Sequence, residues 1–326
     1  MTRWLRRHPI AVSALATAIA ACGVLLIAHI TGAEAVGRAF EEIHAWWLAG
    51  IAIAEALTYP AYAIAYRSVA RVHGHAPLSL PLVGRVVAAG FGPFHVAGGF
   101  GVDKQALTAL QEDERSARVR VLGLGMLEWS LLAPTTCITA IVLLVQGADV
   151  MSSLLWPWAI GVPVGFALAL VASAPRWRAR VARIGGKRRA WLADFLDGAG
   201  VLHTLAAHPV KYAGAWLGTA AYWAADIAAF YAALRTFGLH LDLGRLIIAY
   251  ATGYAATRRS LPLGGAGVTE VLMSYALYWV RQPLAPSLAA VVAYRAFNFL
   301  LAAMPALLAR RHVEPLLEAA DELAGG

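Results

Sequence analysis

Long apolar stretches, separated by short polar segments, run along almost the whole chain. A helix of about 20 residues is long enough to cross the roughly 30 Å of hydrocarbon in a bilayer. The stretches that reach this length are residues 10–30, 46–66, 119–146, 152–173, 210–237 and 287–309. No stretch alternates apolar and polar residues as the strands of a membrane barrel do. The pattern therefore predicts an all-α polytopic membrane protein with six transmembrane helices.

Two further apolar windows, residues 82–101 and 243–267, are interrupted by glycine and proline. These residues weaken helices, and broken backbone inside a membrane persists only where protein or a water-filled cavity satisfies its polar groups. If residues 82–101 crossed the membrane, the basic segment 176–189 would face outward, against the tendency of basic loops to stay in the cytoplasm. We therefore expect two re-entrant hairpins, at 82–101 and, with its return helix, at 243–281.

The two windows also resemble each other. GRVVAA at 84–89 matches GRLIIA at 244–249, and GGFGV at 98–102 matches GGAGV at 264–268. This similarity predicts an internal duplication. With six crossings, the first hairpin enters from the cytoplasm and the second from outside, so the halves form an inverted repeat. Glycine-interrupted segments at corresponding positions of two such halves indicate the binding site of a transporter.

Composition and charge support a membrane protein and suggest its orientation. The chain is 60% hydrophobic and 14% charged, with a mean hydropathy of +0.63, unlike a soluble domain. Its net charge of +8 is concentrated beside the apolar stretches, which favours a topological role over nucleic-acid binding. The basic groups are Arg3, Arg6 and Arg7, residues 176–189, and Arg310 with Arg311. We expect all of them, and both termini, on the cytoplasmic side of the cell membrane.

These features predict one integral membrane domain, residues 1–326. Its expected parts are a first half (1–173), a basic cytoplasmic connector (174–209), a second half (210–309) and a cytoplasmic tail (310–326). Two glycine pairs, Gly161 with Gly165 and Gly214 with Gly218, have the small-xxx-small spacing of closely packed membrane helices. We expect both pairs to mark helix packing.

The break in the second hairpin carries a candidate anion site. Arg258 and Arg259 are adjacent cations that one phosphate could neutralise together. The GGAG run that follows, with Gly264, Gly265 and Gly267, precedes an expected helix start, where free N–H groups and the helix dipole favour an anion. The break therefore predicts a site for a membrane lipid with an anionic phosphate headgroup.

Other ionisable residues inside or beside apolar stretches extend this site, since each costs about 2.5 to 3.5 kcal/mol at mid-membrane. Arg295 in the last span is a further phosphate ligand. Glu128 and Asp226, with Glu55, would face a cationic part of a headgroup or carry a coupling proton. Internal ion pairing, for example of Glu128 with Arg295, is the structural alternative.

Two residues of the hairpins complete the set of candidates. Glu270 lies in the first turn after the glycine run, where it either stabilises the helix start or belongs to the site. His95 lies beside Pro93 in the first hairpin and is a candidate titrating group in a cavity.

Motifs of several enzyme classes are missing from the sequence. IGGKRR at 184–189 lacks the spacing and the Ser or Thr of a phosphate-binding loop. No paired-aspartate metal motif, nucleophile elbow or zinc-ligand spacing occurs either. We therefore expect no ATPase, metal site or cofactor, and no enzyme. The acidic run EDE at 112–114 is expected to be solvated.

The motif PLGGAGVTE at 262–270, followed by YR at 294–295, resembles the second half of the lysylphosphatidylglycerol synthase transmembrane region family. FGPFHVAGGFGVDKQAL at 91–107 and ARVRVLGLGMLEW at 117–129 are similar to its first repeat, so the resemblance covers about residues 80–309. In the first half this chain has Asp103 and Lys104 where the family often has Gly-Glu. The family contains flippase-like integral membrane proteins.

The resemblance implies that the protein moves a lipid with a modified headgroup between leaflets, as a flippase. Fused members of the family carry a soluble domain that makes the lipid, and no such domain is expected here. No energy source is visible, so transport is expected to be downhill or ion-coupled. The alternatives are a membrane enzyme or an accessory subunit in glycolipid or polyprenyl-phosphate metabolism. A homo-oligomer and a separate lipid-modifying enzyme are left open as partners.

Overall fold

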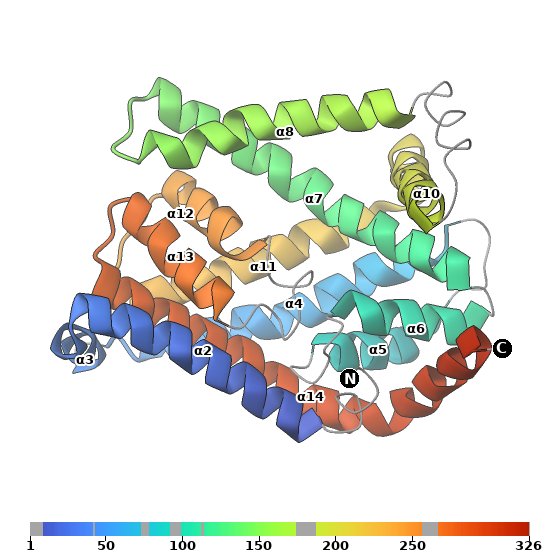
Figure 1. The fold of residues 1–326 in the computed structure, drawn as a ribbon, viewed down its shortest axis with the longest axis horizontal. Coiled ribbons are helices and arrows are strands. Elements are labelled where there is room, and N and C mark those ends of the chain that lie inside the picture. Colours follow the sequence, from blue (N-terminus) through green and yellow to red (C-terminus); the bar gives the residue numbers. More distant parts are fainter. Residues whose placement is uncertain are drawn as a thin grey trace.

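A computed structural model describes residues 9–41, 43–72, 78–91, 99–111, 114–173, 187–255 and 267–325. Within these ranges the chain is helical and contains no strand (Figure 1), which confirms the all-α prediction. The longest helices are α2 (Pro9–Thr31), α4 (Trp46–Ala70), α7 (Glu114–Val145), α8 (Ser152–Ser173), α11 (Ala213–Thr236) and α14 (Leu284–Gly325). The others are α3 (Ala33–Glu41), α5 (Leu80–Phe91), α6 (Gly99–Gln111), α10 (Lys187–Ala207), α12 (Leu243–Tyr250), the π-helix η1 (Ala251–Ala255) and α13 (Val268–Trp279).

Four of the described helices are long and apolar enough to cross a membrane, namely those at Trp46–Ala70, Glu114–Val145, Ser152–Val171 and Leu284–Ala306. A bent pair, Ala21–Ile30 with Glu34–Glu41, turns by 105° and would add a fifth. Helix α11 has 24 residues, which is long enough to span, but it is not among these four helices, and it carries polar side chains such as Asp226 and Thr219. The protein is therefore polytopic, and six crossings remain a prediction.

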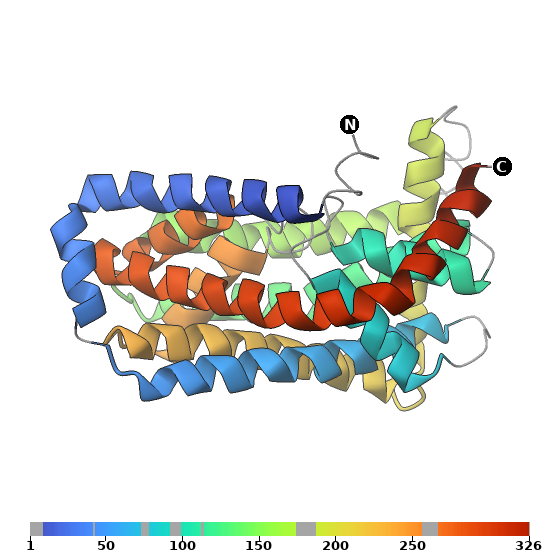
Figure 2. The same cartoon turned by 90° about the horizontal axis from the view of Figure 1, so that it is seen from below.

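Both windows predicted as hairpins contain pairs of short helices. The first window covers most of α5 and only the start of α6, which continues ten residues beyond the predicted end, and the second holds α12, extended by η1, and α13. The segments that join the helices, 92–98 and 256–266, lie outside the described residues. Figures 1 and 2 place α5 and α6 at one end of the molecule and α12 and α13 at the opposite end. This arrangement agrees with an inverted repeat, while re-entry into a membrane remains a prediction.

The contacts between the halves follow the same symmetry. Helices α4 and α11, which precede the two hairpins, pack against each other and run in opposite directions (Figure 2). The first pair, α5 and α6, packs against α14 of the second half, while α12 of the second pair packs against α7 of the first half. The first pair therefore packs against α14, which follows the second hairpin in the chain. The second pair packs, through α12, against α7, which follows the first hairpin.

Close glycine packing joins α4 to α11. A Cβ atom at Gly218 would lie 2.7 Å from the carbonyl oxygen of Ala61 and 2.7 Å from the amide nitrogen of Ala65. The packing role predicted for Gly214 and Gly218 is thus confirmed. The same prediction for α8 is not met among the described residues, where a Cβ at Gly161 or Gly165 would have no neighbour within 4 Å. That side of α8 faces outward in the described part of the chain, with apolar side chains exposed around it.

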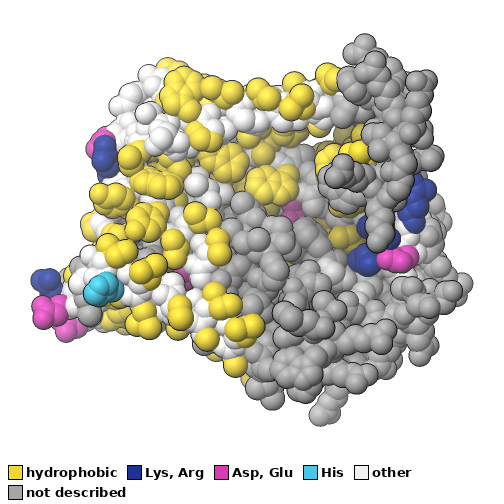
Figure 3. Space-filling view, viewed as in Figure 1, with side chains coloured by type: hydrophobic (Ala, Val, Ile, Leu, Met, Phe, Trp, Pro, Cys, Tyr) yellow, Lys and Arg dark blue, Asp and Glu magenta, His cyan; other side chains and the backbone are white. Residues whose placement is uncertain are grey.

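The surface also divides into apolar and charged zones. Figure 3 shows hydrophobic side chains over the middle of the visible face, whereas most described charged side chains on that face gather toward its two ends. A helical bundle in a bilayer has this distribution, because lipid tails contact its middle and water contacts its ends.

Candidate functional site

A set of charged and amide side chains lies buried between the long helices. Its members are Glu55 on α4, Asp103 on α6, Arg120 and Glu128 on α7, Asp226 on α11, Glu270 on α13, and Arg295 and Asn298 on α14. Acidic residues outnumber arginines in this set, so its formal charge is negative. No three His, Cys, Asp or Glu side chains within the described ranges come together as metal ligands would.

Glu270 and Arg295 form a buried ion pair at the start of α13. Arg295 Nε donates to Glu270 Oε1 over 2.9 Å, and the two side chains are 5% and 2% exposed. The backbone N–H of Gly267 donates to the other oxygen, Glu270 Oε2, over 2.6 Å. The guanidinium of Arg295 also lies 4.6 Å from the ring centroid of Phe299. Glu270 thus stabilises the helix start and also ties α13 to α14.

Gly267 has a conformation and surroundings that suit glycine. Its φ of +80° lies in the left-handed region, where other residues are strained. A Cβ atom at Gly267 would lie 2.8 Å from Ile19 Cγ2 and 2.9 Å from the Ile19 carbonyl oxygen. A Cβ atom at Gly23, also on α2, would lie 3.1 Å from the Gly267 carbonyl oxygen. Helix α2 therefore covers the start of α13 through close backbone contact.

Asp226 lies fully buried between two tyrosines from different helices. Tyr250 donates its hydroxyl to Oδ2 of Asp226 over 2.7 Å, and Tyr294 donates to Oδ1 over 2.6 Å. These lengths lie within the usual range of O–H···O hydrogen bonds. The three residues join α11, α12 and α14. We refer to Asp226, Tyr250 and Tyr294 as the tyrosine clasp.

Two further buried contacts join helices around the interior. Asn298 on α14 donates to Glu55 Oε2 on α4 over 2.9 Å, so the two halves are linked by an amide and a carboxylate. In the first half, Tyr62 donates its hydroxyl to Asp103 Oδ2 over 2.9 Å, and Tyr66 donates to the Asp103 carbonyl oxygen over 3.2 Å. Asp103 is therefore an interior acid that ties α6 to α4.

The structure describes some of the remaining site residues predicted from the sequence and not others. Glu128 is buried on α7, and its carbonyl oxygen accepts from Trp223 Nε1 on α11 over 3.0 Å. The ion pair of Arg295 is with Glu270, as described above. The other candidates, His95, Arg258, Arg259, Gly264 and Gly265, lie outside the described residues. The structure thus brings Gly267, Glu270 and Arg295 together and leaves the arginine pair a prediction.

Sequence reasoning missed Asp103, Arg120 and Tyr250 as interior polar residues. Asp103 directly follows the first glycine-rich window, and Arg120 lies at the start of the third predicted span. An acid or arginine at the edge of an apolar window is the signal that could have identified both. A buried tyrosine such as Tyr250 leaves no such signal, because tyrosine is common in membrane helices.

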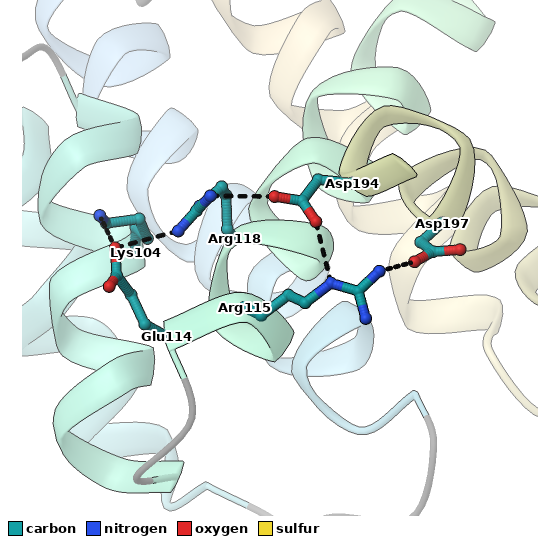
Figure 4. A network of polar contacts seen from close by, with 6 residues as sticks. All are labelled: Lys104, Glu114, Arg115, Arg118, Asp194 and Asp197. Carbon is teal, nitrogen blue, oxygen red and sulfur yellow. Dashed lines mark hydrogen bonds and ion pairs between the residues drawn. The ribbon is translucent and has the colours of Figure 1, made fainter. Parts of the chain in front are cut away.

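A second polar network lies at the end of the molecule that holds α10 (Figure 4). It consists of Lys104 on α6, Glu114, Arg115 and Arg118 on α7, and Asp194 and Asp197 on α10. Lys104 Nζ lies 2.9 Å from Glu114, and Arg118 contacts both Glu114 (3.1 Å) and Asp194 (2.9 Å). Arg115 contacts Asp194 (3.0 Å) and Asp197 (2.7 Å). Glu114 is therefore paired rather than simply solvated.

The fold and these contacts define an α-helical integral membrane protein with a polar interior. The family model of the lysylphosphatidylglycerol synthase TM region matches residues 13–306 of the chain. The chain therefore belongs to this family, which confirms the resemblance seen in its motifs. A search of curated proteins finds no relative that matches the chain.

Proposed function

We propose that the protein is a lipid flippase, which moves a phospholipid or a lipid with a modified headgroup between the leaflets of the cytoplasmic membrane. The observation that carries this proposal is the set of buried charged side chains on α4, α7, α11, α13 and α14. An ionisable group within a membrane bundle is expensive, and such groups mark substrate and ion pathways. Membership of a membrane protein family related to lipid modification and flipping is consistent with it.

In this proposal the two hairpins enter the membrane from opposite sides between six spans, and both termini are cytoplasmic. The headgroup passes through the polar interior while the acyl chains stay in the surrounding hydrocarbon. The positions of α5 and α6 at one end, and of α12 and α13 at the other, support this arrangement (Figure 1). Glycine-interrupted helices that meet a site from opposite sides are typical of transporters with inverted repeats.

The phosphate is held at the second hairpin by Arg258 and Arg259 together with the backbone of Gly264 and Gly265. Support comes from the neighbouring Gly267, whose N–H begins α13 and is bound to Glu270. The structure there presents a helix N-terminus, which favours an anion. Glu270 uses both carboxylate oxygens in the helix start and the ion pair. It therefore positions the hairpin and is poorly suited to the role of a general base.

The buried acids serve the rest of the headgroup. Glu128, Asp226 and Glu55 lie on three different helices, and a negative interior favours a cationic group or a proton. His95, in the first hairpin, supplies a second titratable group in this scheme. Arg295 takes part indirectly, because its ion pair with Glu270 fixes the helix start beside the arginines.

Reconstitution tests the proposal. Purified protein is inserted into vesicles that contain phosphatidylglycerol with a fluorescent tag, and a membrane-impermeant reductant quenches the tag in the outer leaflet. We expect protein-dependent loss of the protected inner-leaflet signal, and its abolition by Arg258→Gln with Arg259→Gln. Arg281→Gln is the control, since Arg281 is an exposed arginine paired with Asp149. A wild-type rate equal to that of protein-free vesicles would contradict the flippase function.

A further inference from the structure

Helix α3 turns sharply away from the long helix that precedes it. The segments Ala21–Ile30 of α2 and Glu34–Glu41 of α3 meet at an angle of 105°. The turn is at Gly32, whose φ of +87° lies in the left-handed region, and the N–H of Ala35 donates to the Gly32 carbonyl oxygen over 3.1 Å. Figure 2 shows α3 running across the ends of the long helices. Since the long helices cross the membrane, α3 runs close to the membrane plane.

The sequence AEAVGRAFE gives α3 a charged face and an apolar face. Glu34, Arg38 and Glu41 are exposed and are spaced by four and three residues, so they lie on one side of the helix. Phe40 lies on the opposite side, where its ring packs edge to face on Phe237 with 5.2 Å between the ring centroids. Helix α3 also contacts α14. A helix with one charged and one apolar face is typical of a segment that lies at a membrane interface.

Three large apolar side chains lie exposed on α3 and in the segment that follows it. Phe40, Ile43 and Trp46 are 48%, 40% and 66% exposed, and we refer to them as the apolar rim. The ring of Trp46 is stacked on that of Trp47, with 3.9 Å between the centroids. Trp47 packs in turn against the ring of Tyr231 on α11, at 5.8 Å. Trp46 is therefore held against the bundle while most of its surface is exposed.

The apolar rim continues an exposed apolar stripe on α4. Ile53, Leu57 and Ile64 follow Trp46 at intervals of seven, four and seven residues, which places all four on one side of the helix. All four are exposed, whereas Glu55, on the opposite side, is buried. From Trp46 to Ile64 the helix rises about 27 Å at 1.5 Å per residue, close to the thickness of the hydrocarbon layer. The stripe thus faces lipid, and Trp46 marks one boundary of the hydrocarbon.

The charge of α3 indicates which part of a lipid this surface contacts. Helix α3 has two acids, Glu34 and Glu41, and one arginine, Arg38, so its formal charge is negative. Segments that recognise anionic lipids carry clusters of Lys and Arg, and α3 has none. Aromatic rings, in contrast, occupy the headgroup level of a bilayer through their apolar surface. The surface therefore fits the boundary between headgroups and acyl chains, without a requirement for anionic lipid.

We propose that α3 and the apolar rim form an interfacial anchor, which binds the boundary between the headgroups and the acyl chains of one leaflet. Helix α3 lies in the plane of the bilayer with its charged face toward water, and Phe40, Ile43 and Trp46 insert below the headgroups. The anchor is fixed to the bundle, because the N–H of His44 donates to the carbonyl oxygen of Thr236, the last residue of α11, over 2.8 Å. It therefore sets the depth of this end of the bundle. The inference goes beyond lipid transfer and does not depend on it.

Spin labels measure the depth of the anchor without any transport. Single cysteines are placed at Glu34, Arg38, Ile43 or Trp46 in a chain whose two native cysteines are replaced by serine, and each is labelled with a nitroxide. The protein is reconstituted in phosphatidylcholine vesicles. Oxygen concentrates in hydrocarbon and a nickel chelate stays in water, so the ratio of their collision rates with the label reports depth. We expect a severalfold higher ratio at Ile43 and Trp46 than at Glu34 and Arg38.

Two control positions calibrate these values. A label at Leu57, exposed in the middle of α4, gives the value for hydrocarbon, and a label at Asp149, exposed between α7 and α8, gives the value for water. Labels at Ile43 and Trp46 should lie between the two, and the label at Arg38 should lie near Asp149. If the change at Trp46 prevents folding, Ile43 decides.

Three results would overturn the anchor. Aqueous values at all four positions would place α3 in water. A depth that increases steadily along α3 would make it the continuation of a broken span that starts in α2. Low collision rates with both reagents at Ile43 would place the apolar rim against another protein or a second copy of this chain.

Lipid composition tests the chemistry of the partner. Phosphatidylglycerol added to the vesicles, or a high salt concentration, should leave the values at Ile43 and Trp46 unchanged. Insertion that appears only with phosphatidylglycerol, and that salt reverses, would identify an anionic headgroup as the partner and overturn the proposed chemistry. An inactive protein in the lipid-transfer assay would contradict the proposed flippase function and leave these measurements as decisive as before.

Discussion

Replacement of Glu270 by glutamine should destabilise the protein strongly, because it breaks a buried ion pair from one side. The side chains of Glu270 and Arg295 are 2% and 5% exposed and lie 2.9 Å apart. Removal of one partner of a buried ion pair typically costs about 3 to 5 kcal/mol, because the remaining charge loses its ion-pair partner. Glutamine also has one acceptor oxygen where glutamate has two, so the bond from Gly267 or the bond from Arg295 is lost. Loss of the helix-start bond would add about 1 kcal/mol.

A surface ion pair with the same N–O distance supplies the control. Arg281 and Asp149 are also 2.9 Å apart, but their side chains are 55% and 73% exposed. Exposed pairs contribute only about 0 to 1 kcal/mol, so Asp149→Asn should change little. The assay is denaturant unfolding of the detergent-solubilised protein, followed by tryptophan fluorescence. The distance and the signs of the charges are the same in both pairs, so the comparison measures the effect of burial together with the helix-start bond that Glu270 also accepts.

The double variant Glu270→Leu with Arg295→Met sharpens the test. It removes both charges, so no uncompensated charge remains, and the loss of stability should be smaller than that of Glu270→Gln alone. Equal losses from Glu270→Gln and Asp149→Asn would refute the assignment of Glu270 and Arg295 as a buried pair that holds the hairpin.

Three other predictions concern packing and topology. Gly218→Val should cost about 1 to 3 kcal/mol in the same unfolding assay, because its Cβ would lie 2.7 Å from the backbone of α4, whereas Gly161→Val, with open space around it, should be neutral. Gly267→Ala should cost about 1 kcal/mol or more because of its positive φ and the contact with Ile19, and unchanged stability would contradict this. A cysteine placed at Leu110, in a cysteine-free background, should react only with cytoplasmic reagents, and labelling only from outside would disprove the topology.

The positions of the long helices could be predicted from the sequence because hydrocarbon imposes a minimum apolar length on any helix that crosses it. Each of the predicted stretches overlaps one long helix of the structure. Helix ends were harder to predict, since a helix can continue into water where polar contacts support it. Helix α7 begins at Glu114, before the predicted residue 119, and its first turns carry Arg115 and Arg118, which bind α10.

The partners of the buried charges could not be predicted, because hydropathy shows where a charge lies along the chain and not what faces it. Tyr250 and Tyr294 are 24 and 68 residues away from Asp226. The role of Glu270 was also ambiguous, and the structure resolves it through two contacts, one local and one across 25 residues. Small-residue spacing likewise predicted close packing at Gly161, where a Cβ atom would meet no described atom within 4 Å, because spacing alone does not show which face of a helix has a neighbour.

Two unlike residues hold corresponding positions in the repeat that the sequence predicts. When GGFGV at 98–102 is aligned with GGAGV at 264–268, Lys104 corresponds to Glu270. Lys104 pairs with Glu114 on α7, and Glu270 pairs with Arg295 on α14, so each ties the return helix of its hairpin to the long helix that follows. The sign of the charge is reversed between the halves, while the mechanical role is the same.

Burial accounts for the difference in chemistry between these two pairs. The side chains of Lys104 and Glu114 remain 33% and 39% exposed near an end of the molecule, where a flexible, hydrated lysine is suitable. The second pair lies in the interior, where a planar arginine forms stronger directional bonds to a carboxylate and can also stack on a ring, as Arg295 does on Phe299. The ion pair between the return helix and the following long helix is therefore partly exposed in the first hairpin and buried in the second.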